Sequence, residues 1–456
     1  MERIIEFVKR NIFLLIAIIL SISLLFLINE NTSKVIVLEI FVWLWFLLGK
    51  RFKDFTYSSI LLLFLVLPFN LSFQIPLASI DPYVNGVFTN YLVPTVSILD
   101  LFAGILLLSA IIEGNVSKKE ISWEISLLAI FAGIKFLFDQ NIVSLLGSMR
   151  ILLYLLSFKV ILNARKITGD KKIGNIIKGL ILFETAVSIL QFCKGSSLGI
   201  SFLGESVFSS GMKGSNFVDL GGSLYIRGYS TFPHPNILAG WLLLSMTFLK
   251  RSKTGMYFQL MASLGVLLTF SRIGVLLTAV FWILSAAEFL RMKKTDKGFS
   301  FFPSLIIGRI NDLFIGGDSS ISDRRDLLRE SIYILKRNWS FGCGYNNFVR
   351  EMGERMPKTS NEVWLNQPVH NILMLSLSEM GVVGTVLLVL SYWKTFLLNT
   401  VDIKERWNFF IFLVIILVGA FDHYLFSLPQ GLMIGMTFLI LMHRNGESGI
   451  RTHGTR

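Results

Sequence analysis

The residues best suited to chemistry lie in a polar stretch from Ser319 to Gly384, which interrupts an otherwise apolar chain. At its centre His370 follows Pro368-Val369 and stands directly before an apolar run that begins at Ile372. A neutral imidazole in this position can accept a proton from a hydroxyl near neutral pH, which is the work of a general base. The alternative is an interfacial histidine that only hydrogen-bonds to a loop.

Three arginines on the outer half of the predicted membrane region could bind an anion. Arg227 leads into the start of a helix, Arg272 lies in a turn between two apolar runs, and Arg150 falls inside an apolar run. Guanidinium groups at membrane depth are costly, and they usually meet an anion there. Together they indicate a phosphate or pyrophosphate site. The alternatives are lipid-headgroup contact for Arg272 and a structural carboxylate partner for Arg150, either Glu184 or Asp100.

Four further residues are secondary candidates. His234 and Asn236 follow prolines at a helix entrance, where capping the helix is the simpler use. Asp422 and His423 resemble a dyad, but the side chains of adjacent residues do not pair usefully, so a structural use is favoured.

No nucleotide or metal motif is visible in the sequence. There is no Walker loop and no dinucleotide fingerprint, so no nucleotide energy source is indicated. The carboxylates of the 317–370 loop do not form a DxD-type metal site, which disfavours a metal-dependent transferase. We therefore expect no metal site and no cofactor.

The composition predicts the element that must position these residues. The 456-residue chain is 53% hydrophobic and only 16% charged, with a mean hydropathy of +0.64. Such a chain is predicted to be an all-α, polytopic transmembrane helix bundle, and its continuous apolar runs argue against a β-barrel. The net charge of +13 gathers at the ends of apolar runs, so it indicates membrane topology rather than nucleic-acid binding. Cys193 and Cys343 have no metal-ligand spacing and are interpreted as free thiols, with a disulfide as the alternative if both lie outside the cytoplasm.

About 12–14 spans are expected, each of about 20 apolar residues or somewhat fewer. Lysines and arginines cluster in alternate loops, so the positive-inside rule places both termini in the cytoplasm and loops 194–235 and 317–370 outside. The 299–316 segment is the weakest span, because Arg309, Asn311 and Asp312 interrupt it, and a re-entrant segment is the alternative. The expected spans lie near 11–28, 34–49, 55–68, 91–112, 121–138, 143–163, 173–193, 236–250, 255–270, 273–290, 299–316, 371–393, 407–422 and 428–442.

The chain divides into three parts. Residues 1–193 are expected to be N-terminal transmembrane helices, 194–442 a membrane domain with the two outer loops, and 443–456 a polar C-terminal tail. Within the second loop, Ser322-Asp323 can cap a helix that ends near Asn338. The glycine-rich residues 339–348 predict a tight turn.

These residues together resemble the superfamily of O-antigen ligases and O-antigen polymerases, which are bacterial membrane glycosyltransferases. The resemblance covers about residues 220–390, and each motif alone is weak, but their order and spacing fit the family. Phe341 stands where the family often has proline. The matching pieces are Arg-Gly-Tyr-Ser-Thr-Phe-Pro-His-Pro-Asn-Ile-Leu-Ala-Gly at 227–240, Thr-Phe-Ser-Arg-Ile-Gly at 269–274, Arg324 with Leu327 and Leu328, Phe-Gly-Cys-Gly-Tyr-Asn-Asn-Phe at 341–348, His370-Asn371, and Glu-Met-Gly-Val-Val-Gly at 379–384.

The resemblance implies transfer of a glycan from a polyprenyl diphosphate donor to an acceptor hydroxyl on the outer face of the cytoplasmic membrane. It implies His370 as the group that activates the acceptor, and Arg227 and Arg272 as the groups that hold the diphosphate. Arg150, Arg324 and Asn371 complete the expected substrate-binding set. The implied partners are the lipid-linked donor, a glycan or lipid-linked saccharide acceptor, and membrane lipids, with no metal or cofactor.

Other functions remain open at this stage. The acceptor that separates a ligase from a polymerase or a protein-glycosylating enzyme cannot be read from the sequence. A polytopic transporter or flippase for lipid-linked oligosaccharides is the competing class, although such proteins usually show internal repeats and none is visible here. A scaffold with an inactive site is the third possibility.

Overall fold

The computed structural model describes most of the chain, and 74% of the residues it describes are helical. The described residues are 2–25, 28–75, 80–116, 122–163, 171–209, 212, 215–220, 222–249, 255–293, 319–355, 366–394 and 406–450. The predominance of helix confirms the all-α prediction. The helices are α1 Glu2–Leu25, α2 Ile28–Phe52, α3 Phe55–Val66, α4 Ile98–Ile112, α5 Trp123–Asp139, α6 Ile142–Asn163, α7 Lys171–Lys194, α8 Pro235–Leu249, α9 Gly255–Leu268, α10 Arg272–Lys293, α12 Ser319–Arg337, α13 Phe348–Gly353, α14 Ile372–Tyr392, α15 Arg406–Phe421, α16 Tyr424–Ser427 and α17 Pro429–Ile450.

The strands form three small antiparallel pairs, β1 with β4, β2 with β3, and β5 with β6. Two of these pairs lie between α3 and α4, and the third is a hairpin just before Arg227. Two short 3-10 helices accompany them, η1 and η4. The bounds are β1 Ser72–Gln74, β2 Tyr83–Val84, β3 Val87–Phe88, η1 Asn90–Leu92, β4 Thr95–Ser97, η4 Ser201–Leu203, β5 Phe217–Leu220 and β6 Ser223–Ile226.

Four helices within the described residues are long and apolar enough to cross a membrane. A set of shorter apolar helices, of 10–17 residues, accompanies them and includes α8, α9 and α15. These helices indicate a membrane protein, as predicted, whereas the full set of 12–14 spans stays a prediction. The four long segments are Thr32–Phe52, Ile142–Asn163, Lys171–Lys194 and Ile372–Tyr392.

Most of the expected spans fall on a helix. The prediction for 91–112 was too long, because residues 90–97 form η1 and β4 and helix α4 begins only at Ile98. The segment 299–316 lies outside the described residues. The boundary expected at 442–443 falls inside α17, which continues to Ile450. Helix α12 begins at Ser319, slightly before the predicted cap, and ends at Arg337, close to the predicted end.

The start of α4 shows why the helix begins where it does. The Ser97 side chain accepts a hydrogen bond from the Leu99 backbone N–H (3.2 Å), and the Asp100 carboxylate accepts one from the Ser97 N–H (2.8 Å). This reciprocal capping box satisfies N–H groups that have no partner inside the helix. The strand residues before Ser97 therefore lead directly into a well-defined helix.

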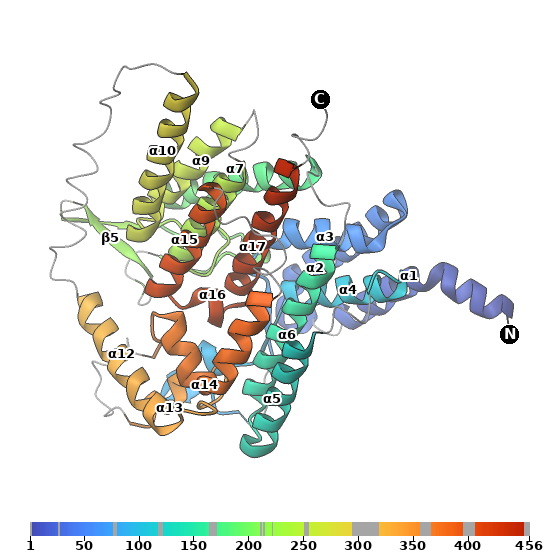
Figure 1. Cartoon of the computed structure of the whole chain (residues 1–456), viewed down its shortest axis with the longest axis horizontal. Helices are drawn as coiled ribbons and strands as arrows, with labels where there is room; N and C mark the ends of the chain where they lie inside the picture. Colours follow the sequence, from blue (N-terminus) through green and yellow to red (C-terminus); the bar gives the residue numbers. More distant parts are fainter. Residues whose placement is uncertain are drawn as a thin grey trace.

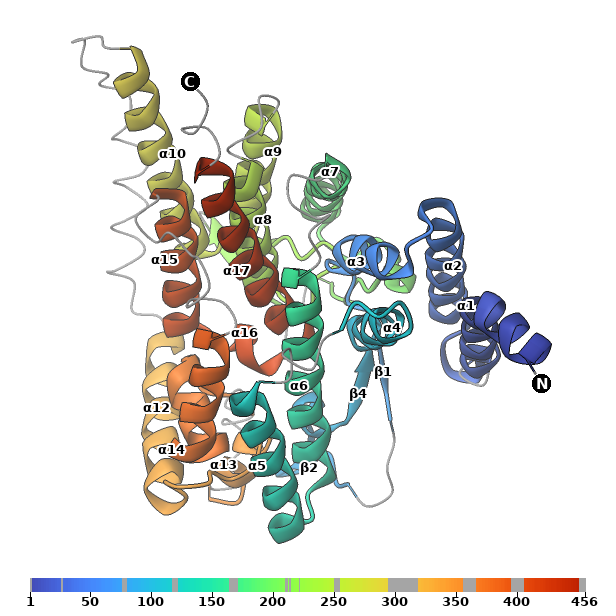
Figure 2. The same ribbon diagram turned by 45° about the vertical axis from the view of Figure 1, so that its right-hand side comes forward.

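Helices far apart in sequence lie side by side (Figure 1). Helix α8 packs against α9, α10, α15 and α17, while α14 packs against α5, α12 and α15. In both views α12, α13 and α14 lie together below α15 and α17, and the short α16 lies between these two groups (Figure 2). Helices α1 and α2 lie at the opposite edge of the molecule. Helix α16 therefore lies where the helices α14, α15 and α17 of the C-terminal half come together.

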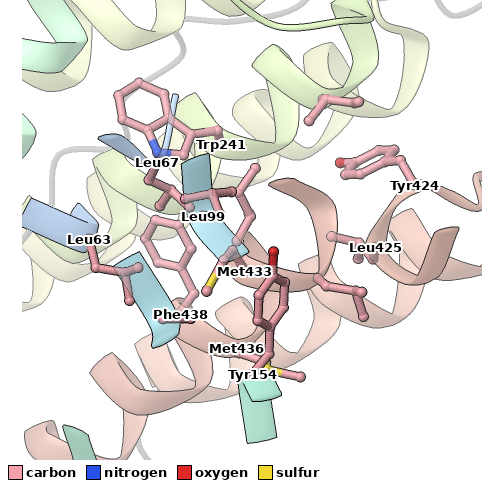
Figure 3. Packing of buried hydrophobic residues seen from close by; sticks show 14 of the residues in the cluster. Leu63, Leu67, Leu99, Tyr154, Trp241, Tyr424, Leu425, Met433, Met436 and Phe438 are labelled. Carbon is pink, nitrogen blue, oxygen red and sulfur yellow. The ribbon is translucent and has the colours of Figure 1, made fainter. Parts of the chain in front are cut away.

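One apolar core holds α17 against the N-terminal helices. Met433, Met436 and Phe438 of α17 are buried and gather near Leu99 of α4 and Tyr154 of α6 (Figure 3). Burial of each such side chain contributes roughly 1.5–3 kcal/mol relative to leaving it exposed to water. This packing fixes the position of α16 and of the residues that precede it.

Candidate active site

A chain of polar contacts links Arg227 to His370 through two further residues. The Arg227 Nη2 donates to the Asn236 Oδ1 (2.7 Å), and the Asn236 Nδ2 donates to the Asp422 Oδ2 (2.9 Å). The His370 Nδ1 then lies 3.7 Å from the Asp422 Oδ1, which is longer than a hydrogen bond but places the imidazole directly beside the carboxylate. One carboxylate therefore connects the candidate base to the candidate anion-binding arginine.

Asn371 positions His370 in this chain. Its side-chain oxygen caps α14 by accepting from the Met374 N–H (2.9 Å), and its Nδ2 donates to the Ala420 carbonyl (3.1 Å). The start of α14 is thereby tied to the end of α15, just before Asp422. Both ends of the carboxamide are used in this way. The contacts indicate that Asn371 holds the site together, whereas the sequence predicted a substrate contact.

His423 lies beside His370, with ring centroids 5.1 Å apart. Its Nδ1 pairs with the Ser427 Oγ (2.6 Å), and its backbone N–H donates to the Asp422 Oδ1 (2.8 Å). Asp422 and His423 thus form no side-chain dyad with each other, as expected from the sequence. The Asp422 carboxylate instead lies beside the His370 ring, which makes Asp422 a candidate member of the site.

The loop that carries Arg227 is held by the end of α9 on one side. The Arg227 Nε donates to the Thr269 carbonyl (2.7 Å), and the Gly228 N–H donates to the Leu268 carbonyl (2.8 Å). Because Arg272 begins α10 only three residues after Thr269, these bonds bring two of the predicted arginines to the same edge of the molecule.

Buried polar side chains of α7 hold the other side of this loop. Gln191 accepts hydrogen bonds from the Tyr229 and Ser230 N–H groups (3.2 and 2.7 Å), and Glu184 accepts from the Thr231 hydroxyl (2.9 Å). Ser230 has φ of 52°, a left-handed conformation that is uncommon for a residue other than glycine. The two α7 residues therefore fix a backbone shape that the loop would not adopt alone. Sequence analysis did not identify Gln191, although a polar residue inside an apolar run is a signal of this kind.

The charges of three arginines act on one another. Burial, with a smaller contribution from the positive charges of Arg272 and Arg324, lowers the pKa of Arg227 to about 10, while Tyr229 and Asp422 oppose this effect. Arg272 and Arg324 are exposed to solvent at the starts of α10 and α12. Three of the four predicted arginines are therefore close enough for the charges of Arg272 and Arg324 to act on the partly buried guanidinium of Arg227.

The carboxylate and two of the histidines are held in defined charge states. Burial by itself would raise the pKa of Asp422, but the adjacent His370 holds it well below its usual range. Burial lowers the pKa of His234 to about 4 and that of His423 to about 3. At neutral pH the cluster therefore contains an ionised Asp422 and two neutral imidazoles beside His370. The His234 Nδ1 accepts a hydrogen bond from the Asn236 N–H (3.1 Å), which is the capping role expected for it.

Arg150 is separate from this chain of contacts. Its Nε and Nη2 bind the two oxygens of Asp100 (both 2.8 Å), and Nη2 also donates to the Thr95 carbonyl. The Tyr154 hydroxyl donates to the same carboxylate (2.6 Å). A bidentate pair of this kind satisfies the buried guanidinium without a ligand. The geometry favours the structural alternative for Arg150, with Asp100 rather than Glu184 as its partner.

The glycine-rich turn at 339–344 fits into a break in α14. Gly381 has φ of 65° and interrupts the helix, and around it the Cys343 N–H donates to the Ser378 carbonyl (2.9 Å) while the Val382 N–H donates to the Trp339 carbonyl (2.8 Å). A Cβ atom on Gly381 would lie 2.3 Å from the Ser340 carbonyl oxygen. Two of the motifs behind the family resemblance therefore form one structural joint.

We expect Gly381→Ala to destabilise the protein by about 1–3 kcal/mol, because alanine would be strained at this φ and its Cβ would collide with backbone. Gly133→Ala in α5 is the matched control, since nothing lies within 4 Å of its added Cβ. There alanine should be neutral or stabilise the helix by roughly 0.5–1 kcal/mol. Thermal unfolding of the purified full-length variants measures both. Equal unfolding midpoints for Gly381→Ala and wild type would contradict the close packing of the 339–344 turn against the break in α14.

Comparison with known proteins does not identify a family for this chain. No protein-family model matches the chain, and no curated protein matches it. The family resemblance therefore rests on the sequence motifs alone.

Proposed function

We propose that the protein is an integral membrane glycosyltransferase of the O-antigen ligase and polymerase type. It would transfer a glycan from a polyprenyl diphosphate donor to an acceptor hydroxyl on the outer face of the cytoplasmic membrane. The observation that carries this proposal is the chain of contacts from Arg227 through Asn236 and Asp422 to His370. A candidate base and a candidate diphosphate-binding group are thereby joined in one site.

The reaction requires only groups that this cluster offers. The acceptor oxygen forms a bond to the anomeric carbon of the donor, while the bond from that carbon to the diphosphate oxygen breaks. The acceptor proton passes to the Nε2 atom of His370, because the Nδ1 atom of the same ring lies beside Asp422. The diphosphate leaves with the bonding electron pair, and its charge is stabilised by the fixed arginines.

Asp422 would orient the imidazole and stabilise the imidazolium that forms when His370 takes the proton. This is the role of the acidic residue in a Ser-His-Asp triad, which does not itself become protonated. Arg227 commits only part of its five N–H donors to Asn236 and Thr269. Its remaining N–H groups can bind the diphosphate together with Arg272 and Arg324.

The proposal is tested by reconstituting the full-length protein in lipid nanodiscs with a polyprenyl-diphosphate-linked oligosaccharide and a panel of acceptors. The acceptors are a lipid-anchored core saccharide, a second glycan repeat and a glycosylatable peptide. We expect a glycosylated acceptor and released polyprenyl diphosphate in equal amounts. A protein that is inactive with every acceptor, yet moves the donor across a vesicle bilayer, would instead be a flippase.

We expect Arg324→Ala to weaken donor binding by about tenfold, because it removes a charge-assisted contact at a partly solvated site. Arg325→Ala is the matched control, since a neighbouring helix position points about 100° away. Titration of each variant with the lipid-linked donor measures the effect, which should shrink at high salt. Equal losses in both variants would indicate a general surface charge effect and remove Arg324 from the site.

A further inference from the structure

Three potential metal ligands converge at the junction of α14, α15 and α16. His370, Asp422 and His423 each offer one ligand atom, and these atoms lie within 4.8 Å of one another. His423 is 5% exposed and Asp422 is 9% exposed, so this cluster is not a solvated surface patch. Two imidazoles and one carboxylate are a donor set typical of zinc sites.

The neighbouring bonds orient these groups for binding. The His423 Nδ1 pairs with the Ser427 Oγ (2.6 Å), which fixes the orientation of the ring, and Nε2 is the ring nitrogen that this bond does not use. The Asp422 Oδ2 is held by Asn236, and the His370 Nδ1 is buried without a hydrogen-bond partner among the residues that the structure describes. A buried imidazole nitrogen with no partner is the atom in this cluster that a ligand would satisfy.

The distance between two of the three ligand atoms is close to that in a tetrahedral site. Ligand atoms at about 2.0–2.2 Å from a common zinc ion stand about 3.3–3.6 Å apart. The His370 Nδ1 and the Asp422 Oδ1 are 3.7 Å apart, so only a small adjustment would bring both to one ion.

We propose that His370, Asp422 and His423 bind a divalent transition-metal ion such as Zn²⁺, with water in the fourth position. Imidazole donors favour zinc, copper and nickel over magnesium and calcium. The positive charges of Arg227 and Arg324 oppose a bound cation, so the affinity should be below that of a structural zinc site. The consequence for activity rests on the proposed function: an ion on His370 occupies the base and inhibits transfer.

Binding is tested with Zn²⁺ alone on full-length protein that carries no histidine tag and has been stripped with chelator. Competition against a chromophoric zinc chelator gives the affinity and stoichiometry. We expect one site in wild type, with affinity lowered by about 100-fold in His423→Ala and about tenfold in Ser427→Ala, which removes only the orienting hydroxyl. His370→Ala, at a more exposed position, should resemble His423→Ala. His443→Ala is the matched control and should bind as wild type does.

Equal zinc affinity in wild type, His370→Ala and His423→Ala would overturn the proposal, as would loss of binding in His443→Ala. Size-exclusion profiles identify any variant that is misfolded, and the Ser427→Ala and His370→Ala results then decide. Zinc binding is measured without a glycan substrate, so it does not depend on the proposed function. If zinc binds with the expected pattern but leaves transfer by an active enzyme unchanged, the metal site stands and His370 is not the base.

Discussion

His370→Ala is expected to lower glycan transfer by about 10²- to 10⁴-fold while leaving donor binding nearly unchanged. The imidazole lies at the opposite end of the contact chain from Arg227, where it would take the acceptor proton but would not hold the diphosphate. The variant removes no contact of Arg227, because Asn236 and Thr269 hold that guanidinium independently. The rate of a single turnover with saturating donor, together with a donor titration, separates the two effects.

His443→Ala controls for the loss of a histidine elsewhere in the chain and should transfer at the wild-type rate. Compared with this control, three results for His370→Ala test its assignment as the base. Unchanged transfer by His370→Ala would remove this residue as the base. Loss of donor binding together with transfer would make it a binding residue. Slow transfer that an added small imidazole restores would strengthen the assignment as a base, because imidazole can enter the space that the side chain leaves.

The positions of the helices could largely be predicted from the sequence, because runs of apolar residues are the strongest signal in such a chain. The exceptions have physical reasons. Residues 91–97 belong to the apolar run that predicted a span, yet residues 90–92 form η1 and residues 95–97 pair with β1, so α4 begins only at the Ser97 cap. The break at Gly381 has no signature in the sequence, because glycine is common inside membrane helices and its φ is set by the turn packed against it.

The candidate site was only partly predictable. His370, Arg227 and Arg272 stand out because each lies in a polar segment close to the start of an apolar run, which can be read from the sequence around a single position. The contacts between the site residues could not be predicted in this way, because Asn236 and Asp422 are 186 residues apart and meet only when α8 packs beside α15. For the same reason the sequence left two partners open for Arg150, and only the packing of α6 against α4 selects Asp100.

Asp422→Asn is expected to lower transfer by about 10²- to 10⁴-fold, because it removes the carboxylate that orients and stabilises the imidazole of His370. It should also disturb Arg227. The Oδ1 position must stay an oxygen to accept from the His423 N–H, so the new NH₂ group would face the Nδ2 of Asn236, donor against donor. If the Asn236 amide turns to relieve this clash, it presents its own NH₂ to Arg227. We therefore expect a lower unfolding midpoint as well as slower transfer.

Adding Asn236→Asp to Asp422→Asn separates these two consequences. The double variant keeps the total charge and restores every donor–acceptor direction, since a carboxylate at 236 accepts from both Arg227 and the amide at 422. Thermal unfolding should therefore return close to the wild-type midpoint, as expected for coupled residues in one network. Transfer should remain slow, because the negative charge now lies at position 236 rather than beside His370. Recovery of transfer in the double variant would show that His370 needs no carboxylate at 422, and that the effect of Asp422→Asn acts through the arginine alone.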